Sequence, residues 1–212
     1  MTQTIMTFGD SNTYGTPPAH QPGENRRYDA SIRWPRVMQR ALGDGYEVIE
    51  QGLPGRTTAF PDTIMGDHMD GRIGLRIALE SNGPIDLLII MLGTNDLQTH
   101  YGKTPEQVIG GVASLLAIAK SEVYQTRHGG FEVMLICPPE VLEQGCYRNT
   151  LYGAAAKSKA LPPLYQGLAD HWGIPILFAQ DVIQSSPLDG LHFEAEDQVA
   201  LGKAIAAKVA AL

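Results

Sequence analysis

Residues that together activate a hydroxyl nucleophile lie at opposite ends of this 212-residue sequence. Ser11 follows a short apolar segment in "GDSN", while Asp189 and His192 share the later string "DGLH". A serine hydroxyl becomes a useful nucleophile when a base removes its proton and a third group orients that base. The Asp-x-x-His spacing lets the carboxylate accept a hydrogen bond from Nδ1 of the imidazole and leaves Nε2 facing the serine. The three residues therefore predict acyl transfer through Ser11.

Acyl transfer also needs hydrogen-bond donors aimed at the oxyanion of its tetrahedral intermediate. The candidates are the N–H of Ser11, the N–H of Gly55 in "GLPGRTT" and the side-chain amide of Asn95 in "GTND". Gly55 has no Cβ, so its backbone can approach a ligand closely, and Asn95 offers an uncharged donor. We expect these three residues to form the oxyanion hole.

Short apolar segments that alternate with helical ones must position these residues. Strands are predicted at 4–8, 46–51, 85–92, 131–137 and 174–179, and helices at 31–43, 71–83, 104–125, 157–173 and 194–212. The segment 85–92 is apolar on both faces, which is typical of a central parallel strand covered by helices on each side. The alternation predicts a three-layer α/β/α sandwich with a central five-stranded parallel sheet, flavodoxin-like, in one domain over residues 1–212.

Ligands of such sheets bind beyond the carboxyl ends of the strands, because loops and helix N-termini converge there. The polar strings that contain Ser11, Gly55, Asn95 and His192 all follow predicted strands or precede the closing helix. Two long irregular segments, 16–30 and 138–156, are expected to shape a pocket at this edge.

Composition argues against several other classes of protein. The 16 basic and 23 acidic residues give a formal charge of −7, and no run of Lys or Arg could track nucleic acid or an anionic membrane. The N-terminal residues show neither a basic n-region nor an apolar h-region, which favours a cytoplasmic protein. Cys137 and Cys146 are expected to be free thiols. We expect a small-molecule ester as substrate and no cofactor or metal.

The same strings carry a family resemblance. "FGDSNTYG", "VIEQGLPGRTT", "IIMLGTND" and "DGLHF" resemble the conserved blocks of the SGNH (GDSL-type) serine hydrolases, in the branch with mycobacterial arylesterases and acyltransferases. The resemblance covers nearly the whole chain. It implies Ser11, Asp189 and His192 as catalytic residues, Ser11, Gly55 and Asn95 as the oxyanion hole, and a homo-oligomer. Asn12 replaces the leucine of the family motif.

The predicted function is a serine esterase that hydrolyses short-chain, acetyl-type esters through an acyl-enzyme on Ser11, with acyltransferase or perhydrolase side activity. Thr16 replaces an aromatic residue of the mycobacterial acyltransferase, so a preference for acyl transfer is not implied. A carbohydrate acetyl esterase is one alternative. A second is a metal-dependent phosphoesterase, for which the sequence offers no basic phosphate cradle and whose ligands would be Asp10, Asp96, Asp189 and His192. A third is a non-catalytic module that binds esters or carbohydrates.

Several other polar residues near these strings need separate interpretation. Asp10 is expected to hold the serine turn by hydrogen bonds. Arg56, beside the oxyanion glycine, is expected either to bind substrate or to pair with Glu50 or another acid. The acidic string "PDTIMGDHMDG" matches no metal-ligand spacing and is interpreted as a solvated loop; its candidate ligands are Asp62, Asp67, His68 and Asp70.

Overall fold

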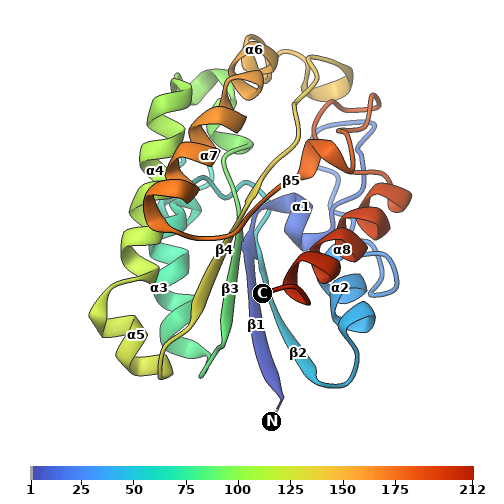
Figure 1. Ribbon diagram of the computed structural model, residues 1–212. Coiled ribbons are helices and arrows are strands. Elements are labelled where there is room, and N and C mark those ends of the chain that lie inside the picture. The colour runs from blue at the N-terminus through green and yellow to red at the C-terminus, as the bar shows by residue number, and fades with distance from the viewer. Residues whose placement is uncertain (1) are drawn as a thin grey trace.

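The computed structural model describes residues 2–212 and contains one parallel sheet of five strands. The strand order is β2-β1-β3-β4-β5, with β1 and β3 side by side at the centre (Figure 1). The strands are β1 (Gln3–Gly9), β2 (Tyr46–Gly52), β3 (Leu87–Met91), β4 (Glu132–Cys137) and β5 (Ile176–Phe178). All five predicted strands are therefore confirmed.

Helices cover both faces of this sheet. In Figure 1, α3, α4, α5 and α7 lie on one side and α2 and α8 on the other, which confirms the predicted three layers. The helices are α1 (Ser11–Tyr14), α2 (Trp34–Leu42), α3 (Gly71–Ser81), α4 (Pro105–Ala119), α5 (Glu122–His128), α6 (Ala154–Lys159), α7 (Leu161–Trp172) and α8 (Ala195–Val209). No helix within residues 2–212 has the length and apolar character that crossing a bilayer requires.

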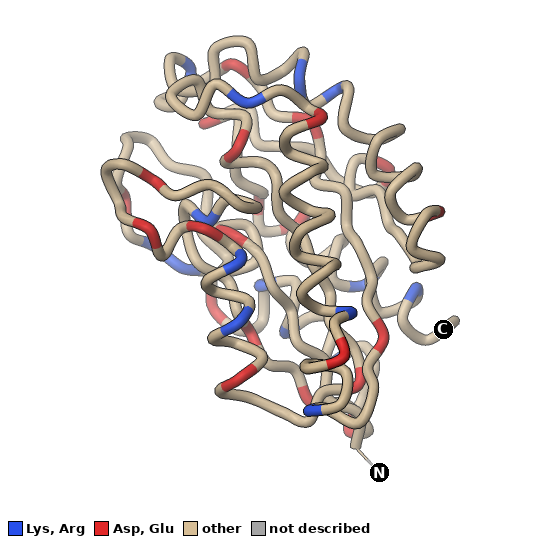
Figure 2. The backbone as a smooth tube through the Cα atoms, turned by 90° about the vertical axis from the view of Figure 1, so that its left-hand side faces the viewer, with Lys and Arg blue, Asp and Glu red and all other residues tan. Residues whose placement is uncertain are grey.

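Side chains of β3 alternate between two apolar cores, which explains why its sequence is apolar throughout. Leu88 and Ile90 belong to the core under α3, α4 and α7, whereas Ile89 belongs to the core under α2 and α8. A strand covered on both faces gains apolar burial at every position. Acidic and basic residues are interspersed along the chain in the view of Figure 2.

Two predicted helices are each divided into two. The segment 104–125 forms α4 and α5 because Ser121 adopts an extended backbone, with φ −66° and ψ 147°. The segment 157–173 is divided between α6 and α7, since Pro162 and Pro163 lie in the first turn of α7 and lack the N–H groups that would continue α6. In addition, α6 begins at Ala154, inside the segment predicted to be irregular.

Helices α2 and α8 cross at Gly202, next to the elements that carry the serine and the histidine. A Cβ at Gly202 would lie 2.7 Å from the carbonyl oxygen of Trp34 and 2.7 Å from Cβ of Val37. These distances are too short for a side chain, so the close approach of the two helices requires glycine at this position.

We expect Gly202→Ala to lower the free energy of unfolding by about 1–3 kcal/mol, because the new methyl group forces α2 away from α8. Gly110→Ala on α4 is the matched control, since nothing lies within 4 Å of a Cβ there. The control should raise stability by up to about 1 kcal/mol through the gain in helix propensity. Urea unfolding of both variants measures these changes, and equal effects would contradict the argument.

Candidate active site

Ser11 is the first residue of the single helical turn α1, directly beyond the carboxyl end of β1. Asp10 caps this turn, accepting a hydrogen bond from the N–H of Asn12 at 2.9 Å, as predicted. A Cβ at Gly9 would lie 2.7 Å from the carbonyl oxygen of Met91, so only glycine fits where the strand ends. Because β1 and β3 are neighbours, Ser11 lies at the point where the strand order reverses, which is where ligands of such sheets bind.

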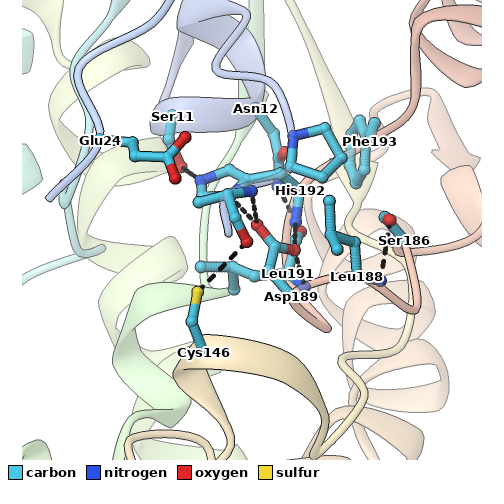
Figure 3. Close-up of polar contacts among 12 residues, drawn as sticks. Ser11, Asn12, Glu24, Cys146, Ser186, Leu188, Asp189, Leu191, His192 and Phe193 are labelled. Atoms are coloured by element: carbon cyan, nitrogen blue, oxygen red, sulfur yellow. Dashed lines mark hydrogen bonds and ion pairs between the residues drawn. The ribbon is translucent and has the colours of Figure 1, made fainter. Parts of the chain in front are cut away.

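Ser11, His192 and Asp189 form a continuous hydrogen-bonded chain. Nε2 of His192 lies 3.0 Å from Oγ of Ser11, and Nδ1 lies 2.7 Å from Oδ2 of Asp189. Figure 3 shows the imidazole between the serine and the carboxylate. All three residues are at least 95% buried. The structure thus brings together residues that are 181 positions apart in the chain, with the ring nitrogens used as the sequence suggested.

Asp189 is held in place by three backbone N–H groups in addition to the histidine. Oδ1 accepts from Leu191 at 2.9 Å and from His192 at 3.0 Å, and Oδ2 accepts from Ala19 at 2.8 Å. Burial raises the pKa of Asp189, but the hydrogen bond and charge of His192 outweigh it and hold the pKa below its ordinary value. The carboxylate is therefore ionised near neutral pH and can stabilise a positive imidazolium.

The sequence analysis gave no role to Ala19, Cys146 and Asn12, which contact the segments around Asp189 and His192. Ala19, in the irregular segment 16–30, donates to Asp189, and its carbonyl oxygen accepts from Sγ of Cys146 at 3.3 Å. The amide of Asn12 donates to the carbonyl oxygen of Leu191 at 3.2 Å (Figure 3). The departure of Asn12 from the family motif was a usable signal, whereas a backbone N–H such as that of Ala19 leaves none.

The proposed oxyanion donors border the same cavity as Ser11 and His192. Asn95 donates through Nδ2 to the carbonyl oxygen of Arg56 at 3.0 Å, while its Oδ1 accepts from Gln98 at 2.9 Å. These two bonds fix the orientation of the amide and leave the second hydrogen of Nδ2 available. Gly55 has φ +88°, a conformation that favours glycine. Within residues 2–212 the N–H groups of Ser11 and Gly55 have no hydrogen-bond acceptor.

The cavity has a volume of about 420 Å³ and combines polar and apolar walls. The irregular segment 16–30 contributes Thr16, Glu24 and Arg26, and the segment 138–156 contributes Tyr147, whose ring centroid lies 6.0 Å from that of His192. Met65 and Leu191 add apolar surface. The two long segments therefore border the site, as the sequence analysis expected.

Arg56 forms neither of the contacts that the sequence analysis considered. Its side chain donates to the backbone carbonyl oxygens of Gly9, at 2.9 Å, and Gln51, and it is buried away from the cavity. Glu50 is bonded instead to Arg33 and Arg36, at 2.9 Å and 2.8 Å. The expected pairing of Arg56 with Glu50 is wrong because two arginines nearer to Glu50 already satisfy its carboxylate.

Two of the carboxylates considered as metal ligands, those of Asp62 and Asp70, accept hydrogen bonds from the protein itself. Asp62 accepts from the N–H groups of Ile64 and Met65 and from the hydroxyl of Tyr101. Asp70 caps α3 and pairs with Arg72, whereas Asp67 and His68 lie in the short turn before α3. The buried carboxylates near Ser11, those of Asp10, Asp96 and Asp189, likewise accept hydrogen bonds from N–H or O–H groups of the protein.

A serine–histidine–aspartate chain beside potential oxyanion donors, at the edge of a parallel α/β sheet, is the arrangement found in serine hydrolases. The chain belongs to the GDSL-like lipase/acylhydrolase family, whose model matches residues 7–198. The resemblance inferred from the sequence strings is thus confirmed, and the protein is an ester hydrolase by family.

Solved structures of similar proteins cover nearly the whole chain. A carbohydrate acetylesterase from Sinorhizobium meliloti is 35% identical, with a TM-score of 0.92 over 99% of both chains. The inhibitor-bound aryl esterase of M. smegmatis is 30% identical, with a TM-score of 0.91 over 99% of both chains. A comparison with curated proteins finds no match. The structural similarities confirm the predicted sandwich fold and support esterase activity.

A second buried carboxylate beneath the site, Asp96, gives the protein a distinctive dependence on pH. Both of its oxygens accept from the N–H of Thr58, at 3.0 Å and 3.1 Å, and the threonine hydroxyl donates to Oδ1. Burial raises the pKa of Asp96 from 3.8 to about 6, although these hydrogen bonds oppose the rise. The folded protein therefore binds a proton at Asp96 more readily than the unfolded chain does.

Because the folded pKa is the higher one, the stability contributed by protonated Asp96 is complete below pH 3.8 and is lost as the pH rises through about 6. Relative to Asp96→Asn, which does not titrate, the parent protein should gain on the order of 1 kcal/mol between pH 7.5 and pH 5. Urea unfolding of both proteins at the two pH values measures this gain. Asp62→Asn is the control, because the pKa of Asp62 is lowered to about 2 and its carboxyl stays ionised over this range. A constant difference between parent and Asp96→Asn would refute the assignment.

Proposed function

We propose that this protein is a serine esterase that hydrolyses short-chain acyl esters through an acyl-enzyme on Ser11. The observation that carries the proposal is the pair of contacts of one imidazole, 3.0 Å to the serine hydroxyl and 2.7 Å to the Asp189 carboxylate. In this arrangement His192 is both a base for the hydroxyl and a donor to a fixed carboxylate.

In the acylation step, Oγ of Ser11 attacks the ester carbonyl carbon while its proton moves to Nε2 of His192. The carbonyl oxygen becomes an oxyanion that accepts hydrogen bonds from the N–H groups of Ser11 and Gly55 and from the amide of Asn95. The carbon–oxygen bond to the alcohol then breaks, and the imidazolium returns its proton to the leaving alcohol. Asp189 remains ionised and stabilises the imidazolium through Nδ1.

Deacylation repeats these steps with water as the nucleophile. His192 takes a proton from water as its oxygen attacks the acyl carbon, and it then returns that proton to Oγ of Ser11 when the carboxylic acid leaves. An alcohol or hydrogen peroxide in place of water would yield a new ester or a peracid. Acyltransferase and perhydrolase side activities follow from the same site.

The cavity supports a small acyl group and a polar alcohol portion. Its volume of about 420 Å³ is at the lower end of the range for ligand sites. Glu24, Arg26 and Gln98 supply charged and amide groups, and Tyr147 supplies an aromatic face, which together suit a hydroxylated ligand. A carbohydrate acetyl ester is therefore the second candidate substrate, favoured also by the similarity to the Sinorhizobium meliloti carbohydrate acetylesterase.

We expect kcat/KM to fall as the acyl group lengthens, because the cavity beside Ser11 is small, about 420 Å³. The first measurement compares kcat/KM for the p-nitrophenyl esters of acetate, butyrate and octanoate. The second compares acetate release from acetylated xylose with that from p-nitrophenyl acetate. A rise in kcat/KM from acetate to octanoate would contradict the small acyl site. Faster release of acetate from the sugar than from the aryl ester would identify the carbohydrate ester as the better substrate.

Ser11→Ala should lower esterase activity by at least about 10⁴-fold, because the attacking oxygen is removed. The variant should also lose covalent labelling by a serine-directed organophosphonate, detected by mass spectrometry, while its thermal unfolding stays close to that of the parent. Ser114→Ala on α4 is the matched control and should keep full activity, since its hydroxyl donates only to the carbonyl oxygen of Gly111. Retained activity in Ser11→Ala would refute the mechanism.

The same preparation tests the other two functions. An active parent protein separates the esterase from a binding module without turnover. A metal-dependent phosphoesterase would lose its activity in EDTA and regain it with a divalent cation, and it would act on p-nitrophenyl phosphate. The proposed serine mechanism requires unchanged ester hydrolysis in EDTA.

We also propose that the protein forms homo-oligomers. Ile73 and Ile77 lie one turn apart on α3 and are 41% and 61% exposed, and Val123 on α5 is 71% exposed. Contact between copies would remove such apolar surface from water. Light scattering gives the mass in solution, and the mass of a single chain would contradict this proposal.

A further inference from the structure

Arg56 has no part in the proposed mechanism, yet it is one of the most buried charged residues of the described chain. Only 5% of its surface is exposed, and it does not border the cavity. Within residues 2–212 no carboxylate forms an ion pair with it. A buried guanidinium of this kind must be explained by its remaining contacts.

The side chain of Arg56 is anchored to the strand that delivers the serine. Nη1 donates to the carbonyl oxygen of Gly9 at 2.9 Å, two residues before Ser11, and to that of Gln51 at the end of β2. The guanidinium carbon lies 4.1 Å from the ring centroid of Phe8. On its other side Gly74 of α3 leaves room, since a Cβ there would lie 3.2 Å from Nη2. The guanidinium is thus enclosed on several sides.

The main chain of Arg56 contacts one residue of the proposed oxyanion hole and follows another in sequence. Its carbonyl oxygen accepts from Nδ2 of Asn95 at 3.0 Å, and its N–H closes the turn by donating to Leu53 at 3.1 Å. The preceding residue is Gly55, which supplies the backbone oxyanion donor. Arg56 therefore contacts the end of the strand before Ser11 through its side chain, and Asn95 through its backbone.

We propose that Arg56 is a positioning residue that fixes the oxyanion donors Gly55 and Asn95 relative to Ser11. This inference rests on the proposed function. Without the guanidinium, only main-chain contacts would set the distance between the oxyanion donors and Ser11. A displacement of about 1 Å at a reacting centre is enough to lower a rate about 10²-fold.

The energetic cost of burying Arg56 supports a functional role. Burial lowers the pKa of Arg56 to about 10, and the charge of Asp10 only partly opposes this. Nε is buried without a hydrogen-bond partner. An apolar side chain of similar length would avoid both costs. The guanidinium is retained where its donors can reach two backbone carbonyls, at the ends of the neighbouring strands β1 and β2.

The test compares Arg56→Met and Arg56→Lys with the parent protein. We expect Arg56→Met to lower kcat/KM for p-nitrophenyl acetate about 10²-fold, and Arg56→Lys to lower it about 10-fold, because the ammonium reaches fewer acceptors than the planar fork does. The inhibition constant of phenylboronic acid, which forms a tetrahedral adduct on serine, should rise by similar factors. A purely structural role would lower the unfolding temperature and leave this constant unchanged in the folded fraction.

A double-mutant cycle with Asn95→Ala tests the connection to the oxyanion hole. Asn95→Ala alone should lower kcat about 10²–10³-fold. If Arg56 acts by positioning the same donors, adding Arg56→Met should cost less than about 10-fold more, whereas independent effects would multiply. Multiplied effects would overturn the inference. Should Arg56→Met not fold, Arg56→Lys takes its place in the cycle, and its added loss on Asn95→Ala should then be less than about 3-fold, against about 10-fold for independent effects.

Arg127→Met is the matched control. Arg127 also donates to two backbone carbonyls, those of Leu79 and Glu80, but on α5 and far along the chain from the site residues. This variant should keep the parent kcat/KM and boronate affinity. If both Arg56 variants keep full activity and hydrolysis still depends on Ser11, the inference about Arg56 is overturned and the proposed function stands. Loss of the Ser11 dependence would instead overturn the proposed function itself.

Discussion

The hydrogen bond between Nε2 of His192 and Oγ of Ser11 is the contact on which the site depends. It joins residues 181 positions apart, so its formation requires the central strand β1, the loop before α8 and the packing of α8 on α2 to be complete. Gln198 of α8 strengthens this closure, since it donates to the carbonyl oxygen of Asn12 and accepts from the N–H of Trp34. The site is thus complete only when both ends of the chain are packed together.

Buried charge is concentrated beneath this contact. Asp10 and Asp96 are fully buried, and burial raises the pKa of each to about 6, while it lowers that of Arg56 to about 10. Each shift arises because burial removes the water that would solvate the charged form of the group. In return, Asp10 caps the serine turn and Asp96 holds Thr58. The same burial that shifts these pKa values surrounds the serine turn and Thr58 with fixed hydrogen bonds.

The sequence predicted those parts of the structure that depend on local pattern. Apolar segments located all five strands, and polar strings at their ends brought Ser11, Asn95 and His192 to one edge, because parallel strands align their carboxyl ends. The division of the segment 104–125 depended on the extended backbone of one residue, Ser121, within an otherwise helical pattern. Sequence periodicity does not reveal such a local change.

Contacts through backbone atoms were beyond prediction for a different reason. The N–H of Ala19 and the carbonyl oxygen of Arg56 belong to every residue type, so no side chain signals that they support Asp189 and Asn95. For Arg56 the sequence left two contacts open, with substrate or with an acid. In the structure the guanidinium instead donates to carbonyl groups at the ends of β1 and β2.

The irregular segment 16–30 contacts Asp189 and also lines the cavity. Its residue Ala19 holds Asp189, while Glu24 and Arg26, five and seven positions later, border the cavity. Glu24 accepts from the N–H groups of His20 and Gln21 and pairs with Arg26, and Arg26 donates to Pro18. A change that opens the cavity by breaking these contacts also loosens the backbone that orients the triad carboxylate. This loop therefore couples one wall of the cavity to the position of the Asp189 carboxylate.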